Sequence, residues 1–180
     1  ELRYQHLRRI ADEEGYEYIV TAHHKDDQAE TVLAHMLRGA GLEGLQGMQA
    51  VADDIWRPCL SVPKEMLIQY AQWLHCFHGE DATNQDTTYD RNWIRQILVP
   101  TCEKRYPGTV DALNRMSHLV QQDVSYLQGE VDRLEKQYVQ REGDTIVLDK
   151  RGLLGEHDAL VSRLWKRLLS PYVRGEQLGK

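Results

Sequence analysis

Two histidines and three carboxylates lie close together near the start of the chain, in the segment HHKDDQAET at residues 23–31. Asp27 and Glu30 are three residues apart and Asp26 and Glu30 are four apart, so a helix here presents them on one side of its first turn. Carboxylates beside a histidine can hold a divalent ion, bind an ammonium group or accept a proton from an amine. A structural explanation stays open, because Asp27 as N-cap with Glu30 at the third helical position forms a capping box.

Arginines form a second candidate group. Arg91 and Arg95 are four residues apart at a predicted helix start, with Asn92 between them, so both guanidinium groups can reach the same anion. Arg38 lies at the edge of a glycine-punctuated segment, residues 39–47, that formally matches a dinucleotide fingerprint. The match is weak, because such a fingerprint follows a strand and opens a helix. We predict a tightly turned loop, with Arg38 able to bind phosphate or carboxylate.

Helices and strands alternate along the first half of the chain. A short helix is predicted over residues 2–14, and aromatic and β-branched residues predict a strand over 16–22 that ends at the two histidines. A helical period of apolar residues follows over 26–38, and a second short strand over 55–60. In open α/β sheets, ligands bind at the carboxyl ends of the strands. The pattern therefore indicates an α/β fold with the acidic cluster at such an edge.

The second half is predicted to be mainly helical. Pro100 and the Pro107-Gly108 pair interrupt the chain, which favours a domain boundary between residues 1–100 and 101–180. Apolar residues at alternating spacings of three and four predict a long helix over 113–138. A short strand over 145–148 and a final amphipathic helix over 160–169 are expected to follow.

Composition excludes several classes of protein. With 41% hydrophobic and 28% charged residues, the chain is that of a globular protein, neither disordered nor fibrous. No apolar run approaches the ~20 residues needed to cross a bilayer. Three scattered cysteines (Cys59, Cys76, Cys102) are too few for a disulfide scaffold and indicate a reducing compartment, the cytoplasm. The net charge is −6, yet residues 150–180 carry seven Lys/Arg and three Asp/Glu, a local balance of +4.

Three segments together resemble one family, the bacterial tRNA(Ile)-lysidine synthetases of the PP-loop ATP pyrophosphatase class. They are TAHHKDDQAETVLAHMLRGAGLEGLQGM at residues 21–48, the pair Arg57-Pro58, and DATNQDTTYDRNWIRQILVP at residues 81–100. The resemblance is specific over about residues 1–100. It implies part of a Rossmann-like catalytic domain, with a parallel sheet and flanking helices, followed by a mainly helical tRNA-binding region.

The resemblance also implies a reaction. Members of the family use ATP, with Mg²⁺, to adenylate C2 of the wobble cytidine in tRNA(Ile) with a CAU anticodon, and the side-chain amine of L-lysine then displaces AMP to give lysidine. By analogy, His23 and Asp26 lie at the reaction centre, and Asp27 and Glu30 bind lysine. The residues implied for nucleotide or tRNA phosphate are Arg38, Arg91, Asn92 and Arg95. The local positive charge adds Arg163, Lys166 and Arg167 of the last helix as expected tRNA contacts.

One departure from the family is the ATP-binding loop. The motif Ser-Gly-Gly-x-Asp-Ser is found nowhere in these 180 residues. We therefore expect the chain to be the carboxyl-terminal part of a catalytic domain, inactive by itself, with an unpaired strand edge over 16–22 that favours a homodimer. Two alternatives stay open: a metal-dependent hydrolase with His23, Asp26, Asp27 and Glu30 as ligands, and a noncatalytic helical binding module over 108–172.

Overall fold

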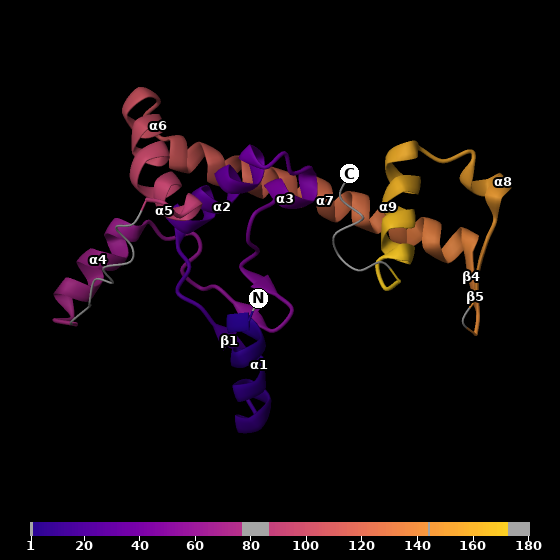
Figure 1. Cartoon of the computed structure of the whole chain (residues 1–180), viewed down its shortest axis with the longest axis horizontal. Coiled ribbons are helices and arrows are strands. Elements are labelled where there is room, and N and C mark those ends of the chain that lie inside the picture. The colour runs from indigo at the N-terminus through magenta and orange to yellow at the C-terminus, as the bar shows by residue number, and fades with distance from the viewer. Residues whose placement is uncertain (1, 77–86, 144, 173–180) are drawn as a thin grey trace. The chain divides into compact units, whose positions relative to one another are not determined.

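The computed structural model describes residues 2–76, 87–143 and 145–172, which form two compact units (Figure 1). Unit 1 comprises residues 1–121 and unit 2 comprises residues 122–180. The division falls within the longest helix, α7 (Thr109–Tyr138). The first six residues of the third family-like segment, residues 81–86, lie outside the described residues.

A small sheet organises unit 1. Its strands are β1 (Ile19–Val20), β2 (Val51–Ala52) and β3 (Ile55–Trp56), in the order β1-β3-β2. β1 is parallel to β3, and β2 is antiparallel to β3. The strands predicted over 16–22 and 55–60 are therefore too long, and β2 was not predicted. The chain leaves the sheet after Thr21, whose N–H donates to the Trp56 carbonyl at 2.9 Å, and Pro58 has no N–H with which β3 could continue.

Helices make up most of unit 1. Those of unit 1 are α1 (Leu2–Glu14), α2 (Lys25–Leu37), α3 (Leu42–Leu45), α4 (Lys64–Trp73), α5 (Asp90–Trp93), the π-helical turn η2 (Ile94–Leu98), α6 (Val99–Arg105) and the first part of α7. α2 packs against α3, α5 and η2. Pro100 does not interrupt the chain as expected, because it lies in the first turn of α6, where its missing N–H disturbs the helix least.

The first turn of α2 differs from the predicted capping box. The N-cap is His24, and Asp27 occupies the third helical position. The His24 side chain accepts the Asp27 N–H, and the Asp27 carboxylate accepts the His24 N–H at 3.0 Å. A ring nitrogen thus replaces the hydroxyl or carboxylate usual at this position, and it leaves Glu30 without a capping role.

The glycine-punctuated segment is an ordered connection that includes α3, which was not predicted. Gln28 binds the carboxyl end of this segment with two hydrogen bonds. Its side-chain amide donates to the Met48 carbonyl at 2.9 Å and accepts the Met48 N–H at 2.7 Å. The same amide donates to the hydroxyl of Ser117 on α7, which donates to the Gln46 carbonyl at 2.7 Å. Buried polar groups are thereby paired, and the segment joins α2 to α7.

We expect Gly47→Ala to destabilise unit 1 by about 2 kcal/mol or more. Gly47 has φ +61°, where a side chain is strained, and an added Cβ would lie 2.7 Å from Gln28 Nε2. Gly39→Ala is the matched control, because Gly39 has φ +74° with no atom near the added Cβ. Urea unfolding of both variants separates the two effects. If both variants lower the free energy of unfolding equally, the close approach of the added Cβ to Gln28 does not contribute to the destabilisation.

Unit 2 has a core of its own. After α7 come the hairpin strands β4 (Val139–Glu142) and β5 (Thr145–Leu148), then α8 (Lys150–Leu153) and α9 (Asp158–Leu169). Five apolar side chains are buried together: Val131, Leu134, Leu153, Leu164 and Leu168. They come from α7, α8 and α9, so the predicted long and final helices are confirmed. Within the described ranges, no helix is long and apolar enough to span a membrane.

Candidate functional site

Two carboxylates from α2 meet two guanidinium groups from α5 and η2. Arg95 Nε donates to Glu30 Oε1 at 2.7 Å, and Arg95 Nη2 donates to Glu30 Oε2 at 2.8 Å and to Asp27 Oδ1 at 2.9 Å. Arg91 donates to the same carboxylates over longer distances, 3.2 Å to Asp27 and 3.4 Å to Glu30. The acidic pair and the basic pair, 61 to 68 residues apart in sequence, thus form one cluster.

Burial distinguishes the members of this cluster. Asp27 and Glu30 are only 7% and 4% exposed, and carboxylates so deeply buried require charged partners. The Arg95 side chain is 28% exposed and that of Arg91 is 53% exposed. Hydrogen bonding to Glu30 raises the pKa of Arg95 above its ordinary value, against the opposing effect of burial. Arg95 is therefore the tightly bound partner, and Arg91 is the one that solvent or a ligand can reach.

The π-helical turn helps to bring the two arginines together. Arg91 is in α5 and Arg95 in η2, and Ile94 between them is buried. A π-turn changes the direction in which successive side chains point, and such turns are frequent at functional sites. Periodicity alone predicts an ordinary helix here.

His23 and Asp26 both precede the residues of this cluster in sequence and have other partners. The Asp26 carboxylate accepts the Lys64 N–H at 2.8 Å, at the start of α4. His23 Nδ1 is 2.9 Å from the Thr21 hydroxyl. Burial lowers the pKa of His23, and the charges of Arg57 and Arg91 lower it further, whereas Asp27 raises it. His23 is therefore neutral at pH 7 and able to accept a proton.

This lowered pKa predicts that His23 titrates below pH 6.5 in the folded chain. The unfolded chain binds the proton more readily, so His23 contributes stability above pH 6.5 that is lost as the pH falls through the lowered pKa. NMR titration of the imidazole resonances, with His23→Gln to assign the signal, measures this. A midpoint at or above 6.5 would contradict the burial argument.

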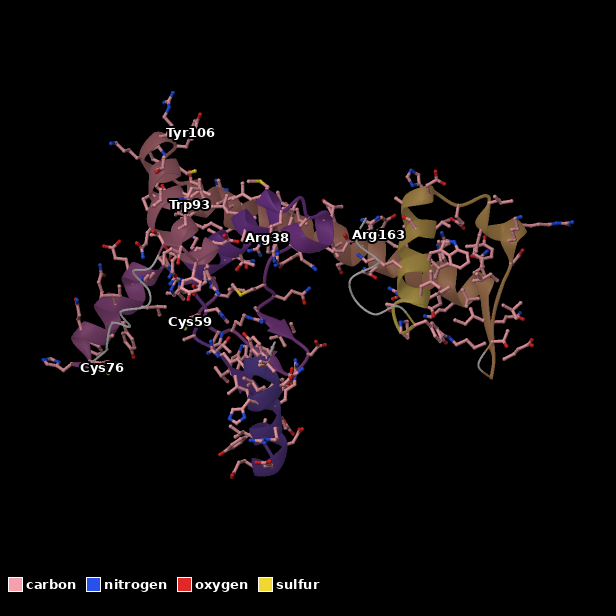
Figure 2. All side chains as sticks on the ribbon, in the orientation of Figure 1. Arg38, Cys59, Cys76, Trp93, Tyr106 and Arg163 are labelled. Atoms are coloured by element: carbon pink, nitrogen blue, oxygen red, sulfur yellow. The ribbon has the colours of Figure 1, made fainter. Side chains whose placement is uncertain are left out.

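The remaining arginines proposed from the sequence are not in this cluster. Arg38, labelled in Figure 2, follows the last residue of α2 and pairs with Asp90 at 2.9 Å, with both side chains exposed. Asn92 lies on α5 and is partly buried. In unit 2, Arg167 pairs with Asp132 and Glu135 of α7.

Arg163, also labelled in Figure 2, and Lys166 lie on the same helix as Arg167, α9. Arg163 Nη1 donates to the Ala159 carbonyl at 2.9 Å, and Lys166 is exposed. Of these three basic residues, Lys166 is the one that solvent reaches most freely, whereas part of the positive charge of Arg167 is neutralised within unit 2.

Arg57 is a charged residue whose burial the sequence did not predict. It follows β3, is 9% exposed, and donates from Nη1 to the Gln49 carbonyl at 2.9 Å. Its Nε is buried without a hydrogen-bond acceptor among the described residues. The signals in the sequence were its place within the strand predicted over residues 55–60, just before a proline, and the pair Arg57-Pro58 in the family resemblance.

The acidic residues are not arranged as a metal site. Within the described ranges, no group of three or more His, Cys, Asp and Glu side chains is placed to hold a metal ion. The oxygens of Asp27 and Glu30 that face the arginines are already engaged. These residues do not fit Mg²⁺ as they stand, so we derive no chemical step through it.

Comparison with known proteins matches the chain to a family and to several named relatives. The PP-loop domain family matches residues 1–102. A tRNA(Ile)-lysidine synthase of Clostridium perfringens is 33% identical over 171 residues, 94% of this chain and 36% of that protein. The Caldanaerobacter subterraneus enzyme of that name is 32% identical over 179 residues, 99% of this chain and 38% of the relative. The Deinococcus deserti enzyme is 42% identical over 122 residues, 68% of this chain and 22% of the relative.

A solved structure shares the fold. The U34-tRNA thiolase NcsA from Methanococcus maripaludis superposes with a TM-score of 0.50 at 20% identity, covering 67% of this chain and 42% of the thiolase. The chain thus spans well under half the length of the relatives named here. Helices and a partly parallel sheet confirm the α/β class, and the family match covers more than half of the residues. The chain belongs to the PP-loop domain family.

Proposed function

We propose that the full-length protein ligates lysine to C2 of the wobble cytidine in tRNA(Ile) with a CAU anticodon, at the expense of ATP. Two observations support this. Relatives that align over nearly the whole chain carry the name tRNA(Ile)-lysidine synthase. The cluster of Asp27, Glu30, Arg91 and Arg95 supplies buried carboxylates that suit an ammonium group.

The proposed reaction has two steps. The C2 oxygen of the cytosine attacks the α-phosphorus of ATP, and pyrophosphate leaves. The side-chain amine of lysine then attacks C2, and AMP departs with that oxygen. The amine must lose a proton before it attacks. His23 is neutral at pH 7 and is the proposed acceptor, with Asp26 beside it at the reaction centre.

Binding of the lysine ammonium group at Asp27 and Glu30 requires that it replace one of the two arginines there. Asp27 and Glu30 carry two negative charges, which Arg91 and Arg95 balance in the structure. Arg91 has the longer contacts and the more exposed side chain, so we propose that the lysine ammonium takes its place while Arg95 stays. The released Arg91 is then available to an anion, such as the lysine carboxylate or a phosphate.

The other proposed roles rest on the family resemblance and on the local positive charge of residues 150–180. Arg38 and Asn92 are proposed contacts for nucleotide or tRNA phosphate. Arg163, Lys166 and Arg167 are proposed tRNA contacts. We keep the proposed division into a catalytic part, residues 1–100, and a tRNA-binding part, residues 101–180, together with Mg²⁺ as companion of ATP, a cytoplasmic location and a homodimer.

The test is the complete reaction with the full-length protein. A tRNA(Ile) transcript with the CAU anticodon is incubated with ATP and lysine, and pyrophosphate release and modified cytidine are measured. We expect both products, and neither with a transcript in which uridine replaces the wobble cytidine. tRNA binding without ATP turnover would instead favour a noncatalytic binding module, and tight stoichiometric Zn²⁺ or Mn²⁺ in the purified protein, without nucleotide, would favour a metal-dependent hydrolase.

A further inference from the structure

Two hydrogen bonds join the start of α4 to the start of α2. The Lys64 N–H donates to the Asp26 carboxylate at 2.8 Å, and the Lys25 N–H donates to the Val62 carbonyl at 3.0 Å. Asp26 and Lys64 are 38 residues apart in sequence. The first N–H groups of a helix have no acceptor within that helix, so each of these bonds pairs a donor that would otherwise depend on solvent. The two helix starts therefore fix each other.

The bond from Lys64 gives Asp26 surroundings that differ from those of its neighbour Asp27. The Asp27 side chain is 10% exposed and is bound by two arginines, whereas the Asp26 side chain is 36% exposed. The Lys64 N–H donates to Oδ2 of Asp26, and His24 Nδ1 lies 3.6 Å from the same oxygen. Within the described residues, no donor is bonded to Asp26 Oδ1. One oxygen is thus fixed by the protein, and the other is left for a substrate.

The Lys64 N–H is well placed to hold a carboxylate in one position. It lies at the amino end of α4, where the partial positive charge of the helix favours an anion. Pro63 precedes it with φ −60° and ψ 142°, and the proline ring restricts rotation of the chain there. The turn before Pro63 is closed by the Val62 N–H, which donates to the Cys59 carbonyl at 2.9 Å. The donor therefore belongs to an ordered segment that follows directly from β3.

The rest of α4 contributes little to the packing of unit 1. None of its ten residues is buried. Its apolar side chains are largely exposed, among them Met66, Tyr70 and Trp73. Within the described ranges, no hydrogen bond or ion pair joins a side chain of α4 to another helix or strand. A helix that served only stability would bury an apolar face, so the contact at its start has a different purpose.

We propose that the Lys64 N–H is a positioning group for Asp26 in the transfer of lysine. It fixes Oδ2, so that Oδ1 meets the reacting groups in one orientation. The inference rests on the proposed function, in which Asp26 lies at the reaction centre beside His23. A displacement of about 1 Å at a reacting group lowers a rate by roughly 100-fold. The bond from Lys64 therefore affects kcat rather than the binding of lysine or ATP.

Lys64→Pro tests this role, because it removes the N–H that Asp26 accepts. Proline is well tolerated at the first position of a helix, and the ψ of 142° at Pro63 is typical of a residue that precedes proline. Lys64→Ala is the matched variant, since it removes the same exposed side chain and keeps the N–H. Comparison of the two variants isolates the hydrogen bond to Asp26.

We expect Lys64→Pro in the full-length protein to lower kcat for lysidine formation about 10- to 100-fold relative to Lys64→Ala, the effect of one hydrogen bond to a charged group. The Michaelis constants for lysine and ATP should differ by no more than about twofold between the two variants, because an interaction that acts on the reacting groups changes kcat. Equal kcat values would overturn the proposal. A higher constant for lysine with an unchanged kcat would also overturn it, because Lys64 would then act in binding.

A second measurement does not depend on catalysis and serves also if Lys64→Pro does not fold. Asp26→Ala removes the acceptor at the start of α4, so hydrogen exchange across residues 64–73 should accelerate about 2- to 30-fold, as for the loss of a helix cap. Asp111→Ala is the control, because it removes an exposed carboxylate that pairs with Lys25 and leaves Asp26 in place. Unchanged exchange of α4 in Asp26→Ala would overturn the proposal. If the wild-type protein makes no lysidine, the proposed function fails, whereas lysidine formation with equal kcat in both Lys64 variants contradicts the positioning role alone.

Discussion

Replacing Glu30 with glutamine in the full-length protein is expected to raise the Michaelis constant for lysine at least 30-fold and to change that for ATP far less. Glu30 is 4% exposed, so an ammonium group bound there is out of contact with water and depends on the carboxylate for its counter-charge. Loss of one partner from such a pair costs about 2 to 5 kcal/mol. Asp27→Asn should act in the same direction, because Asp27 belongs to the same cluster.

Steady-state kinetics with lysine and ATP varied in turn provides the measurement. Glu65→Gln is the matched control, since Glu65 lies in the first turn of α4, as Asp27 does in α2, but is exposed. Circular dichroism and thermal unfolding show whether each variant is folded before its kinetics are interpreted. If the lysine constant stays at the wild-type value in both cluster variants, lysine does not bind at these carboxylates.

Arg95→Gln is expected to lower the free energy of unfolding by about 3 to 5 kcal/mol. The substitution removes three charge-assisted hydrogen bonds of 2.7 to 2.9 Å and leaves the more distant Arg91 as the arginine partner of the buried Asp27 and Glu30 within the described residues. Breaking a buried ion pair on one side is far more destabilising than the pair is stabilising, because the remaining charge is uncompensated.

Urea unfolding of the folded chain measures this loss. Arg38→Gln is the comparison: it removes the exposed pair with Asp90, for which a change of 1 kcal/mol or less is expected. If Arg95→Gln lowers the free energy of unfolding no more than Arg38→Gln does, solvent compensates the charge of the buried carboxylates. Arg95→Gln should also impair lysine use, whereas a change at Arg38 should leave it intact.

The sequence by itself determined the main helices and the family. The apolar period in α2 and in α7 required amphipathic helices, and the structure has them over Lys25–Leu37 and Thr109–Tyr138. Helix formation depends on neighbours three and four residues apart, which a sequence displays directly. Three segments together, residues 21–48, the pair Arg57-Pro58 and residues 81–100, were enough to indicate the PP-loop class, which the family match over residues 1–102 confirms.

Only the tertiary structure decided which charges meet. The arginines and the carboxylates were each identified as candidates for a ligand, yet in the fold they bind one another across 61 to 68 residues of chain. Strand lengths were also set by tertiary contacts, because a strand lasts only while a neighbour supplies hydrogen bonds, and β1 and β3 pair over two residues.

The same holds for Arg57 and for the connection between α2 and α7. Nothing near Arg57 in sequence shows that its guanidinium group is buried beside a cavity, because the walls come from α2 and α7 as well as from its own strand. In the sequence, Gln28 is one polar residue in an acidic run, whereas in the structure it forms hydrogen bonds with Met48 and Ser117. Periodicity gives the face of a helix on which a residue lies, whereas its partners depend on which distant segment packs there.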